Sequence, residues 1–169
     1  MKSPLKGLSA LLDVLKPDGF IKLALYSNIA REDVIKAREI ISSDEIDASK
    51  EKILTFRRKI VSGDFPEIKT LHQWTDFYTT SMFRDLCFHV KEKRYTIEDL
   101  KEILDSFNLE FLGFVLPQGI KEQYSKLFVE DKNQVSLENW KKFEESFPDT
   151  FKAMYQFWVR RSNTNSKGE

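Results

Sequence analysis

The stretch that most constrains this chain is Phe20–Tyr26 (FIKLALY), in which nearly every residue is apolar. A strand with one solvated face alternates apolar and polar residues, whereas a near-continuous apolar run is typical of a strand that helices cover on both faces of a parallel sheet. A leucine-rich helix precedes this run, and Pro17, Asp18 and Gly19 form the turn between the two. The sequence therefore predicts an α/β fold in which residues 20–26 are an interior strand.

The end of this strand predicts where a ligand binds. Open α/β sheets bind ligands beyond the carboxyl ends of their strands. Tyr26 and Ser27 occupy that position and are followed by Asn28, which can cap a helix. We therefore expect Tyr26 and Ser27 to contribute to a binding site.

The next part of the chain is predicted to be helical. Apolar residues at helical spacing indicate helices over about 29–41 and 48–61, with a short helix over 67–73. The segment Trp74–Asp85 mixes aromatic, hydroxyl and charged residues without clean periodicity. Such a segment is typical of a binding loop and equally of a well-packed irregular connection.

The C-terminal part carries clearer signals. Thr96 and Asp99 form a capping box before an amphipathic helix, which a strand over 109–116 follows. Two further helices are expected over about 119–129 and from Ser136 to Phe147. Residues 151–161 fit a helix or a strand, and aromatic and β-branched enrichment favours an antiparallel edge strand over 154–159. The polar residues 162–169 are expected to be a disordered tail.

The amino-acid composition disfavours several classes of function. Lysine and arginine total 27 and aspartate and glutamate total 27, so no net field favours nucleic acid or an anionic membrane. A single cysteine and two histidines cannot supply the four ligands of a structural zinc site. His89 alone could act as a general base, although a lone histidine in an apolar run is more often structural. The lone cysteine suits a reducing compartment, and we expect a cytoplasmic protein without a membrane span.

Several motifs resemble one enzyme family. The run from Leu11 to Gly19 followed by an apolar strand looks like the late motif of class I S-adenosylmethionine (SAM)-dependent methyltransferases. The continuation Tyr26-Ser27-Asn28-Ile29-Ala30-Arg31 resembles a bacterial subgroup that is often attached to tetratricopeptide repeats. Further similarities are found in Ser81–Val90, Leu109–Phe114 and Pro148–Trp158.

The resemblance implies a particular architecture. It predicts a partial Rossmann-like methyltransferase sheet of about three strands, the last an antiparallel edge strand, in a helix-rich α/β fold. Residues 1–161 would form one C-terminal domain fragment with a helical cap insertion at about 29–85, or a solvated helical hairpin that does not contact substrate. The resemblance favours Tyr78, Ser81 and Arg84 as contacts to substrate. The full set of predicted substrate-binding residues is Tyr26, Ser27, Arg31, Tyr78, Ser81, Arg84 and His89.

The sequence lacks a glycine-rich loop after a strand, which the family uses to hold SAM. We therefore expect that Met1 is an internal methionine of a longer enzyme and that SAM, the family's cofactor, does not bind this chain alone. A complementary N-terminal half, or self-association, would cover an exposed sheet edge. The alternative hypothesis is a non-catalytic interaction module derived from such an enzyme.

Overall fold

The structure, a computed structural model, describes residues 4–88, 92–151 and 154–162. The chain divides into two compact units. The sheet unit comprises residues 1–27 and 94–169, and the helical unit comprises residues 28–93. The helical unit occupies the region where the sequence predicts an insertion, at about 29–85. His89 and the greater part of the 162–169 tail lie outside the described residues.

The sheet unit contains four strands in the order β2-β1-β4-β3. They are β1 (Phe20–Ser27), β2 (Arg94–Tyr95), β3 (Leu109–Phe114) and β4 (Met154–Arg161). β2 pairs with β1 in parallel, whereas β4 is antiparallel to both of its neighbours, β1 and β3. The predicted α/β, helix-rich class is therefore confirmed, and so is an antiparallel final strand.

The predicted edge position of the last strand is wrong. β4 lies between β1 and β3, so it is an interior strand of the sheet. The side chains of Tyr155, Phe157 and Val159 are at most 1% exposed, as expected of a central strand. Local composition favours strand over helix but carries no information about which strands will flank it. β2, at two residues, is too short to give a periodic signal.

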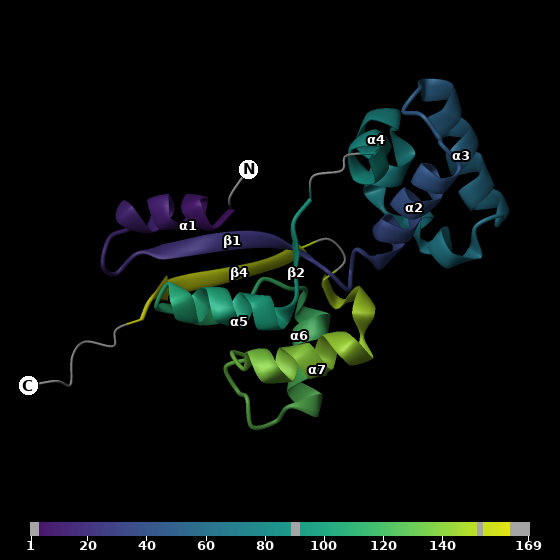
Figure 1. The fold of residues 1–169 in the computed structure, drawn as a ribbon. Coiled ribbons are helices and arrows are strands. Elements are labelled where there is room, and N and C mark those ends of the chain that lie inside the picture. The colour runs from purple at the N-terminus through teal and green to yellow at the C-terminus, as the bar shows by residue number, and fades with distance from the viewer. Residues whose placement is uncertain (1–3, 89–91, 152–153, 163–169) are drawn as a thin grey trace, which may run out of the picture. The chain divides into compact units, whose positions relative to one another are not determined.

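Four α-helices and one 3-10 helix of the sheet unit accompany its described strands (Figure 1). They are α1 (Pro4–Asp13), α5 (Ile97–Ser106), α6 (Gln118–Leu127), α7 (Leu137–Ser146) and the 3-10 helix η3 (Pro148–Phe151). Phe114 joins strands to helices, because its ring contacts Phe157 of β4, Trp140 of α7 and Phe151 of η3 at centroid distances of 4.6–5.9 Å. Trp140 also stacks on Tyr124 of α6 at 3.8 Å.

These helices pack on one face of the sheet. In the β1–β4 register, Ile21 and Leu23 share a face with Val159 and Phe157, and this is the face that carries the aromatic core. The guanidinium of Arg161, on the same face, donates to the carbonyl oxygen of Leu12 in α1 at 2.6 Å. Among the described residues the opposite face stays open, which differs from the expectation that helices cover both faces of residues 20–26.

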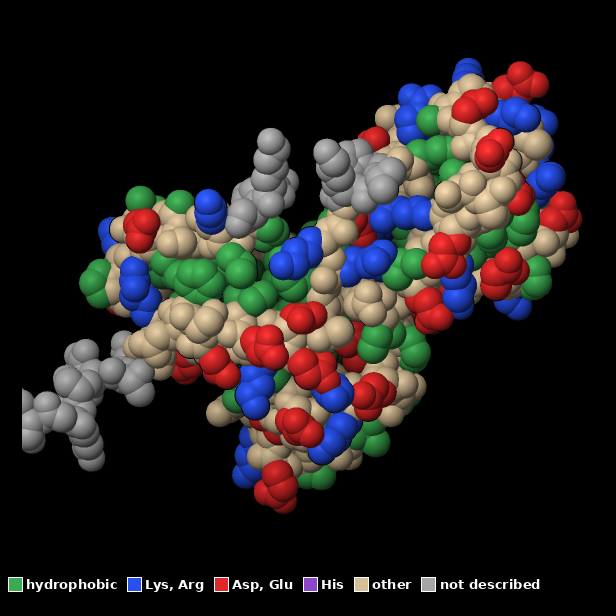
Figure 2. Space-filling view, in the orientation of Figure 1, with side chains coloured by type: hydrophobic (Ala, Val, Ile, Leu, Met, Phe, Trp, Pro, Cys, Tyr) green, Lys and Arg blue, Asp and Glu red, His purple; other side chains and the backbone are tan. Residues whose placement is uncertain are grey.

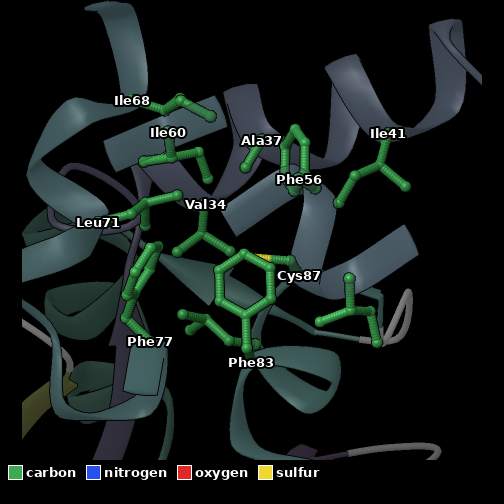
Figure 3. Packing of buried hydrophobic residues seen from close by; sticks show 12 residues of the cluster. Val34, Ala37, Ile41, Phe56, Ile60, Ile68, Leu71, Phe77, Phe83 and Cys87 are labelled. Carbon is green, nitrogen blue, oxygen red and sulfur yellow. The ribbon is translucent and has the colours of Figure 1, made fainter. Parts of the chain in front are cut away.

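The helical unit has a hydrophobic core of its own (Figure 3). It contains α2 (Glu32–Ser43), α3 (Lys50–Ser62), η1 (Pro66–Gln73), η2 (Thr75–Tyr78) and α4 (Thr80–Phe88). Phe56 of α3 and Phe77 of η2 both contact the fully buried ring of Phe83 in α4. α3 is capped by the Ser49 hydroxyl and ends at Gly63, whose φ of 91° is left-handed.

The segment predicted as an irregular loop is mostly helical. Residues 75–78 form η2 and residues 80–85 belong to the first part of α4, whereas Trp74 and Thr79 are extended. Phe83, Leu86 and Cys87 are spaced as i, i+3 and i+4 and are buried, so they form an apolar stripe. Polar residues lie between these apolar positions, so a sequence window as short as α4 shows no clear helical periodicity. Within the described parts of the chain, every helix is too short or too polar to cross a lipid bilayer.

Candidate functional site

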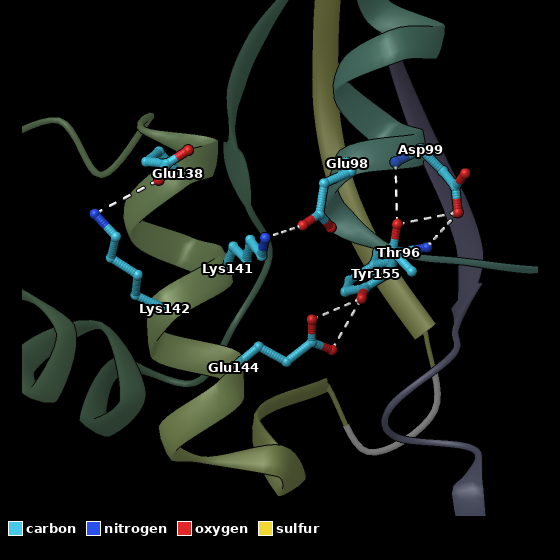
Figure 4. A network of polar contacts seen from close by, with 8 residues as sticks. All are labelled: Thr96, Glu98, Asp99, Glu138, Lys141, Lys142, Glu144 and Tyr155. Atoms are coloured by element: carbon cyan, nitrogen blue, oxygen red, sulfur yellow. Dashed lines mark hydrogen bonds and ion pairs between the residues drawn. The ribbon is translucent and has the colours of Figure 1, made fainter.

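Ser27 ends β1 in a buried polar cluster. Its side chain is fully buried, and its hydroxyl donates to Oε1 of Glu144 in α7 at 2.7 Å. The hydroxyl of Tyr155 in β4 donates to the same carboxylate at 2.7 and 2.9 Å (Figure 4). Three elements distant in sequence therefore meet at the carboxyl end of β1.

Burial dominates the electrostatics of this cluster. It raises the pKa of Glu144 above the usual value of 4.5, against the opposing effect of the hydrogen bonds from Ser27 and Tyr155. Burial, followed by the nearby Glu144 carboxylate, also raises the pKa of Tyr155. Since both hydroxyls donate to a buried carboxylate, the cluster anchors the end of β1 to α7. Ser27 is thereby directed into the interior of the sheet unit.

Tyr26 lies on the opposite face of β1 from Ser27, because successive residues of a strand alternate. It is half-buried and is the first residue of β1 that pairs with β2, opposite Arg94. Both predicted residues of β1 thus belong to the sheet unit, whereas Arg31, Tyr78, Ser81 and Arg84 belong to the helical unit.

Arg31 is the centre of a second buried cluster. Only 5% of the residue is exposed, and its guanidinium pairs with Oε2 of Glu92 at 3.1 Å. The same guanidinium lies 5.4 Å from the ring centroid of Trp74, a cation–π arrangement. Arg38 also binds Oε2 of Glu92, at 3.0 Å, and donates to the carbonyl oxygen of Leu86 near the end of α4. The cluster joins α2 and α4 within the helical unit.

Tyr78, Ser81 and Arg84 present polar groups at the surface. Tyr78 is 64% exposed, and its hydroxyl donates to the carbonyl oxygen of His72 at 2.7 Å. Ser81 and Arg84 are both exposed and lie three residues apart on α4, so they share one helical face. Since Phe83, Leu86 and Cys87 turn to the core, this exposed face of α4 can contact a ligand.

The described glycines do not lie in tight turns that lead from a strand to a helix. Gly63 ends α3 and Gly113 lies at the bulge in β3, so neither lies in a turn from a strand to a helix. Gly119 does follow a strand, but a Cβ placed there would meet nothing within 4 Å, so no close backbone approach requires glycine. Among the described residues, none of these glycines therefore marks a tight strand-to-helix turn, and the expectation that this chain alone does not bind SAM stays a prediction.

Metal or thiol chemistry is also unsupported. No group of three or more possible metal ligands occurs among the described histidine, cysteine, aspartate and glutamate residues. Cys87 is buried, and burial raises its pKa to about 12, so the thiol stays protonated at neutral pH.

Sequence reasoning missed Glu144, Tyr155, Glu92, Arg38 and Trp74. One signal was available for Glu144, which lies four residues after Trp140 and therefore on the same apolar face of α7. An acidic residue on a buried stripe requires a hydrogen-bond partner. No comparable pattern marks Glu92, because its partners lie more than 50 residues away in sequence.

Comparison with known proteins identifies the fold. No family model matches the sequence, and no curated protein matches it. The structure is similar to PKMT2 from Rickettsia typhi, with a TM-score of 0.66 and 14% identity over 95% of this chain and 32% of that protein. A second structure, PKMT2 in complex with AdoHcy, gives a TM-score of 0.58 and 15% identity over 94% of this chain and 33% of that protein. The fold is methyltransferase-like, and the chain spans about a third of PKMT2.

Proposed function

We propose that this chain acts as the substrate-side, C-terminal part of a SAM-dependent methyltransferase. The observation that carries the proposal is the fold similarity to PKMT2, which extends over 95% of this chain and was also found with the AdoHcy complex. The motif Tyr26-Ser27-Asn28-Ile29-Ala30-Arg31 supports the finer assignment to the bacterial class I subgroup that is often attached to tetratricopeptide repeats. A cytoplasmic location remains a prediction.

In this proposal SAM is held by polypeptide outside these 169 residues. The absence of a glycine-rich strand-to-helix turn among the described residues supports that division. SAM, when bound, supplies an activated methyl group. The contribution of this chain is to position the methyl acceptor and to exclude water from it.

The acceptor contacts are proposed to come from Tyr78, Ser81 and Arg84. Their exposure at the surface of the helical unit supports this role. Ser27 and Arg31 are proposed to act as positioning residues, because their side chains bind buried carboxylates within the protein. Tyr26 and His89 stay predicted substrate contacts.

The test compares this chain with the product of its reading frame extended upstream of Met1. We expect calorimetry to detect AdoHcy binding by the extended protein and weak or no binding by the chain alone. The extended protein should also transfer the methyl group of radiolabelled SAM to an acceptor in a panel of proteins and small molecules. An extended protein that neither binds AdoHcy nor transfers methyl would overturn the proposal.

Arg84→Ala tests the acceptor site in the extended protein. We expect KM for the acceptor to rise about tenfold with little change in AdoHcy affinity, since one exposed charged hydrogen bond is lost. Arg58→Ala is the matched control, because Arg58 is an exposed arginine on α3. Equal effects of the two substitutions would remove Arg84 from the acceptor site.

A second candidate function is a non-catalytic interaction module. The inward hydrogen bonds of Ser27 and the buried ion pair of Arg31 favour it, because both residues have structural partners. In this case the extended protein binds a partner but neither AdoHcy nor SAM.

A further inference from the structure

A cavity of about 300 Å³ lies at the β3 edge of the sheet, between β3, α6 and the connection from α6 to α7. Its lining includes Gly113 of β3, Lys121 of α6 and Trp158 of β4. All of the lining residues belong to the sheet unit. This volume is at the lower end of the range for small-molecule sites, so the cavity suits a small ligand.

The backbone that lines the cavity has two unusual conformations. Gly113 has a φ of 121° and lies at the irregularity in the pairing of β3 with β4. Gln134, in the connection from α6 to α7, has a φ of 57°, which residues other than glycine rarely adopt. Bulges and rare backbone conformations both concentrate beside binding sites. A Cβ on Gly113 would meet nothing within 4 Å, so there is open space beside the backbone at this point.

Hydrogen bonds fix the helical side of the cavity. The side-chain amide of Gln134 donates to the carbonyl oxygen of Lys121 at 2.9 Å and to the hydroxyl of Ser125 at 2.7 Å. The indole N–H of Trp140 in α7 donates to the carbonyl oxygen of Gln134 at 2.8 Å. The connection is thereby attached to both α6 and α7. The cavity is therefore formed before a ligand arrives, which lowers the entropic cost of binding.

Two polar side chains of the lining are available to a ligand. Among the described residues, the ammonium of Lys121 and the side-chain amide of Asn133 make no hydrogen bond or ion pair with one another or with a neighbour. Lys121 is half-buried and is the one charged residue of the described lining. A lysine ammonium without a carboxylate partner favours an anionic ligand group, and the Asn133 amide can donate a further hydrogen bond to that group.

Trp158 gives the cavity an aromatic wall. The residue is 43% exposed and lies opposite Gly113 in the β3–β4 register. Because Gly113 has no side chain, no cross-strand neighbour covers the indole on the β3 side. A flat apolar group can therefore stack against this ring.

We infer that this cavity binds a small planar monoanion, an aromatic carboxylate, whose ring lies against Trp158. The carboxylate of the ligand accepts hydrogen bonds from the Lys121 ammonium and the Asn133 amide. Since the ligand contacts β4, α6 and the connection to α7, its binding also stabilises the sheet unit by mass action. The inference goes beyond the proposed function and does not depend on it.

The test uses 2-naphthoate as the probe, with its uncharged counterpart 2-naphthamide and with acetate, which lacks the ring. We expect 2-naphthoate to bind this chain with a dissociation constant of about 1 mM or tighter, as is typical of a ligand with so few non-hydrogen atoms. In two-dimensional NMR spectra it should shift the amide signals of Gly113 and Gln134 and the indole signal of Trp158. The amide and acetate should each bind about tenfold more weakly or worse.

Matched variants test the two side chains that the inference assigns. Lys121→Ala and Trp158→Ala should each weaken 2-naphthoate binding about tenfold or more. Lys126→Ala is the control for the first, because Lys126 is an exposed lysine of α6 outside the lining. Phe20→Ala is the control for the second, because Phe20 is 56% exposed on the same sheet face as Trp158, outside the lining. Both controls should stay within about twofold of wild type.

The Phe20 control also separates the cavity from a general affinity for exposed apolar surface. Figure 2 shows hydrophobic side chains at the surface along β1, beside α1, and a merely hydrophobic probe would bind there as well. Circular dichroism checks that each variant folds, and the signals that shift in the wild type locate the site without any variant.

The inference is overturned if 2-naphthoate shifts no signal at concentrations well above the expected dissociation constant, or shifts only signals outside the lining. It is equally overturned if the Lys121 and Trp158 variants bind like their controls. Equal binding of 2-naphthamide and 2-naphthoate would show that charge is not recognised, so the assignment of an anionic ligand would be wrong. Because SAM is not present in any of these measurements, the result is independent of whether the extended protein transfers methyl.

Discussion

Glu144 is the residue whose environment departs most from what its type prefers. It is 2% exposed, on α7, and is held by hydroxyls of β1 and β4. A buried carboxylate is tolerated where hydrogen-bond donors replace water, and here two donors do so. The carboxyl end of β1 is therefore fixed by a group whose charge depends on pH.

Glu144→Gln should remove that pH dependence. The folded pKa of Glu144 is raised, so the folded protein binds a proton more tightly than the unfolded chain does. The free energy of unfolding of the wild type should therefore fall as pH rises above about 4.5 and level off above the folded pKa of Glu144. The Glu144→Gln variant should not show this decrease. Urea unfolding of both proteins at pH 5 and pH 7.5 measures the difference.

Glu145→Gln is the control for this experiment, because Glu145 is the exposed neighbour of Glu144. The free energy of unfolding of the wild type, minus that of Glu144→Gln, should be larger at pH 5 than at pH 7.5. The opposite order would contradict a raised pKa for Glu144.

At the residue scale, sequence placed Ser27 at the carboxyl end of a strand but could not show which way it points. The hydroxyl of Ser27 points inward to Glu144, which is 117 residues away in sequence. Arg31 likewise looks like a ligand contact in sequence and proves to be an internal ion pair with Glu92. Long-range partners of this kind leave no local pattern, so the predicted substrate roles of both residues stay predictions.

At the scale of elements, α5 shows how far local chemistry determines structure. The Thr96 hydroxyl accepts from the backbone N–H of Asp99, and the Asp99 carboxylate accepts from the backbone N–H of Thr96 at 2.7 Å (Figure 4). This reciprocal capping box is the arrangement that the sequence predicts, and it begins a helix that ends near Phe107. Asn108 follows with a φ of 51°, which asparagine tolerates better than most residues.

Thr96→Ala should lower the free energy of unfolding by about 1 kcal/mol, because the Asp99 N–H loses its acceptor. Thermal or urea unfolding measures the change. Ser106→Ala, at the opposite end of α5, serves as the comparison and should stay within about 0.5 kcal/mol of wild type. Similar losses in both variants would show that the cap contributes nothing specific.

Elements with a local signal were predictable, and those without one were not. The helix after Thr96 and the strand at 109–116 correspond to α5 and β3, since capping and periodicity are properties of short windows. The helix α4 was expected to be a loop, because its apolar stripe is short and interrupted. The place of β4 inside the sheet depends on pairing across distant strands, which no window contains.

At the scale of the whole molecule, the chain has two separate sets of buried side chains. Phe56, Phe77 and Phe83 form the aromatic centre of the helical unit, and Phe114 and Trp140 form that of the sheet unit. Each unit therefore has hydrophobic contacts of its own, and burial of apolar surface stabilises both. A substitution in one core should act mainly on that unit.

Phe83→Ala should destabilise the helical unit by about 3–5 kcal/mol, because it leaves a cavity among rings that are fully packed. Hydrogen exchange should speed up across residues 28–93 and change little in β1, β3 and β4. Val61→Ala is the control, since Val61 is 68% exposed on α3. Uniform loss of protection over both units would show that they unfold together.

The pairing of Tyr26 with Arg94 and of Ser27 with Tyr95 has a consequence for how this architecture can vary. The polypeptide leaves the sheet and returns to it at neighbouring backbone positions, so the intervening segment need not span any distance. Closing a longer loop between two such points costs only about 0.6 kcal/mol for each doubling of its length. Insertions and deletions within residues 28–93 should therefore change the stability of the sheet little. Natural variants of this architecture should differ in length mostly in that segment.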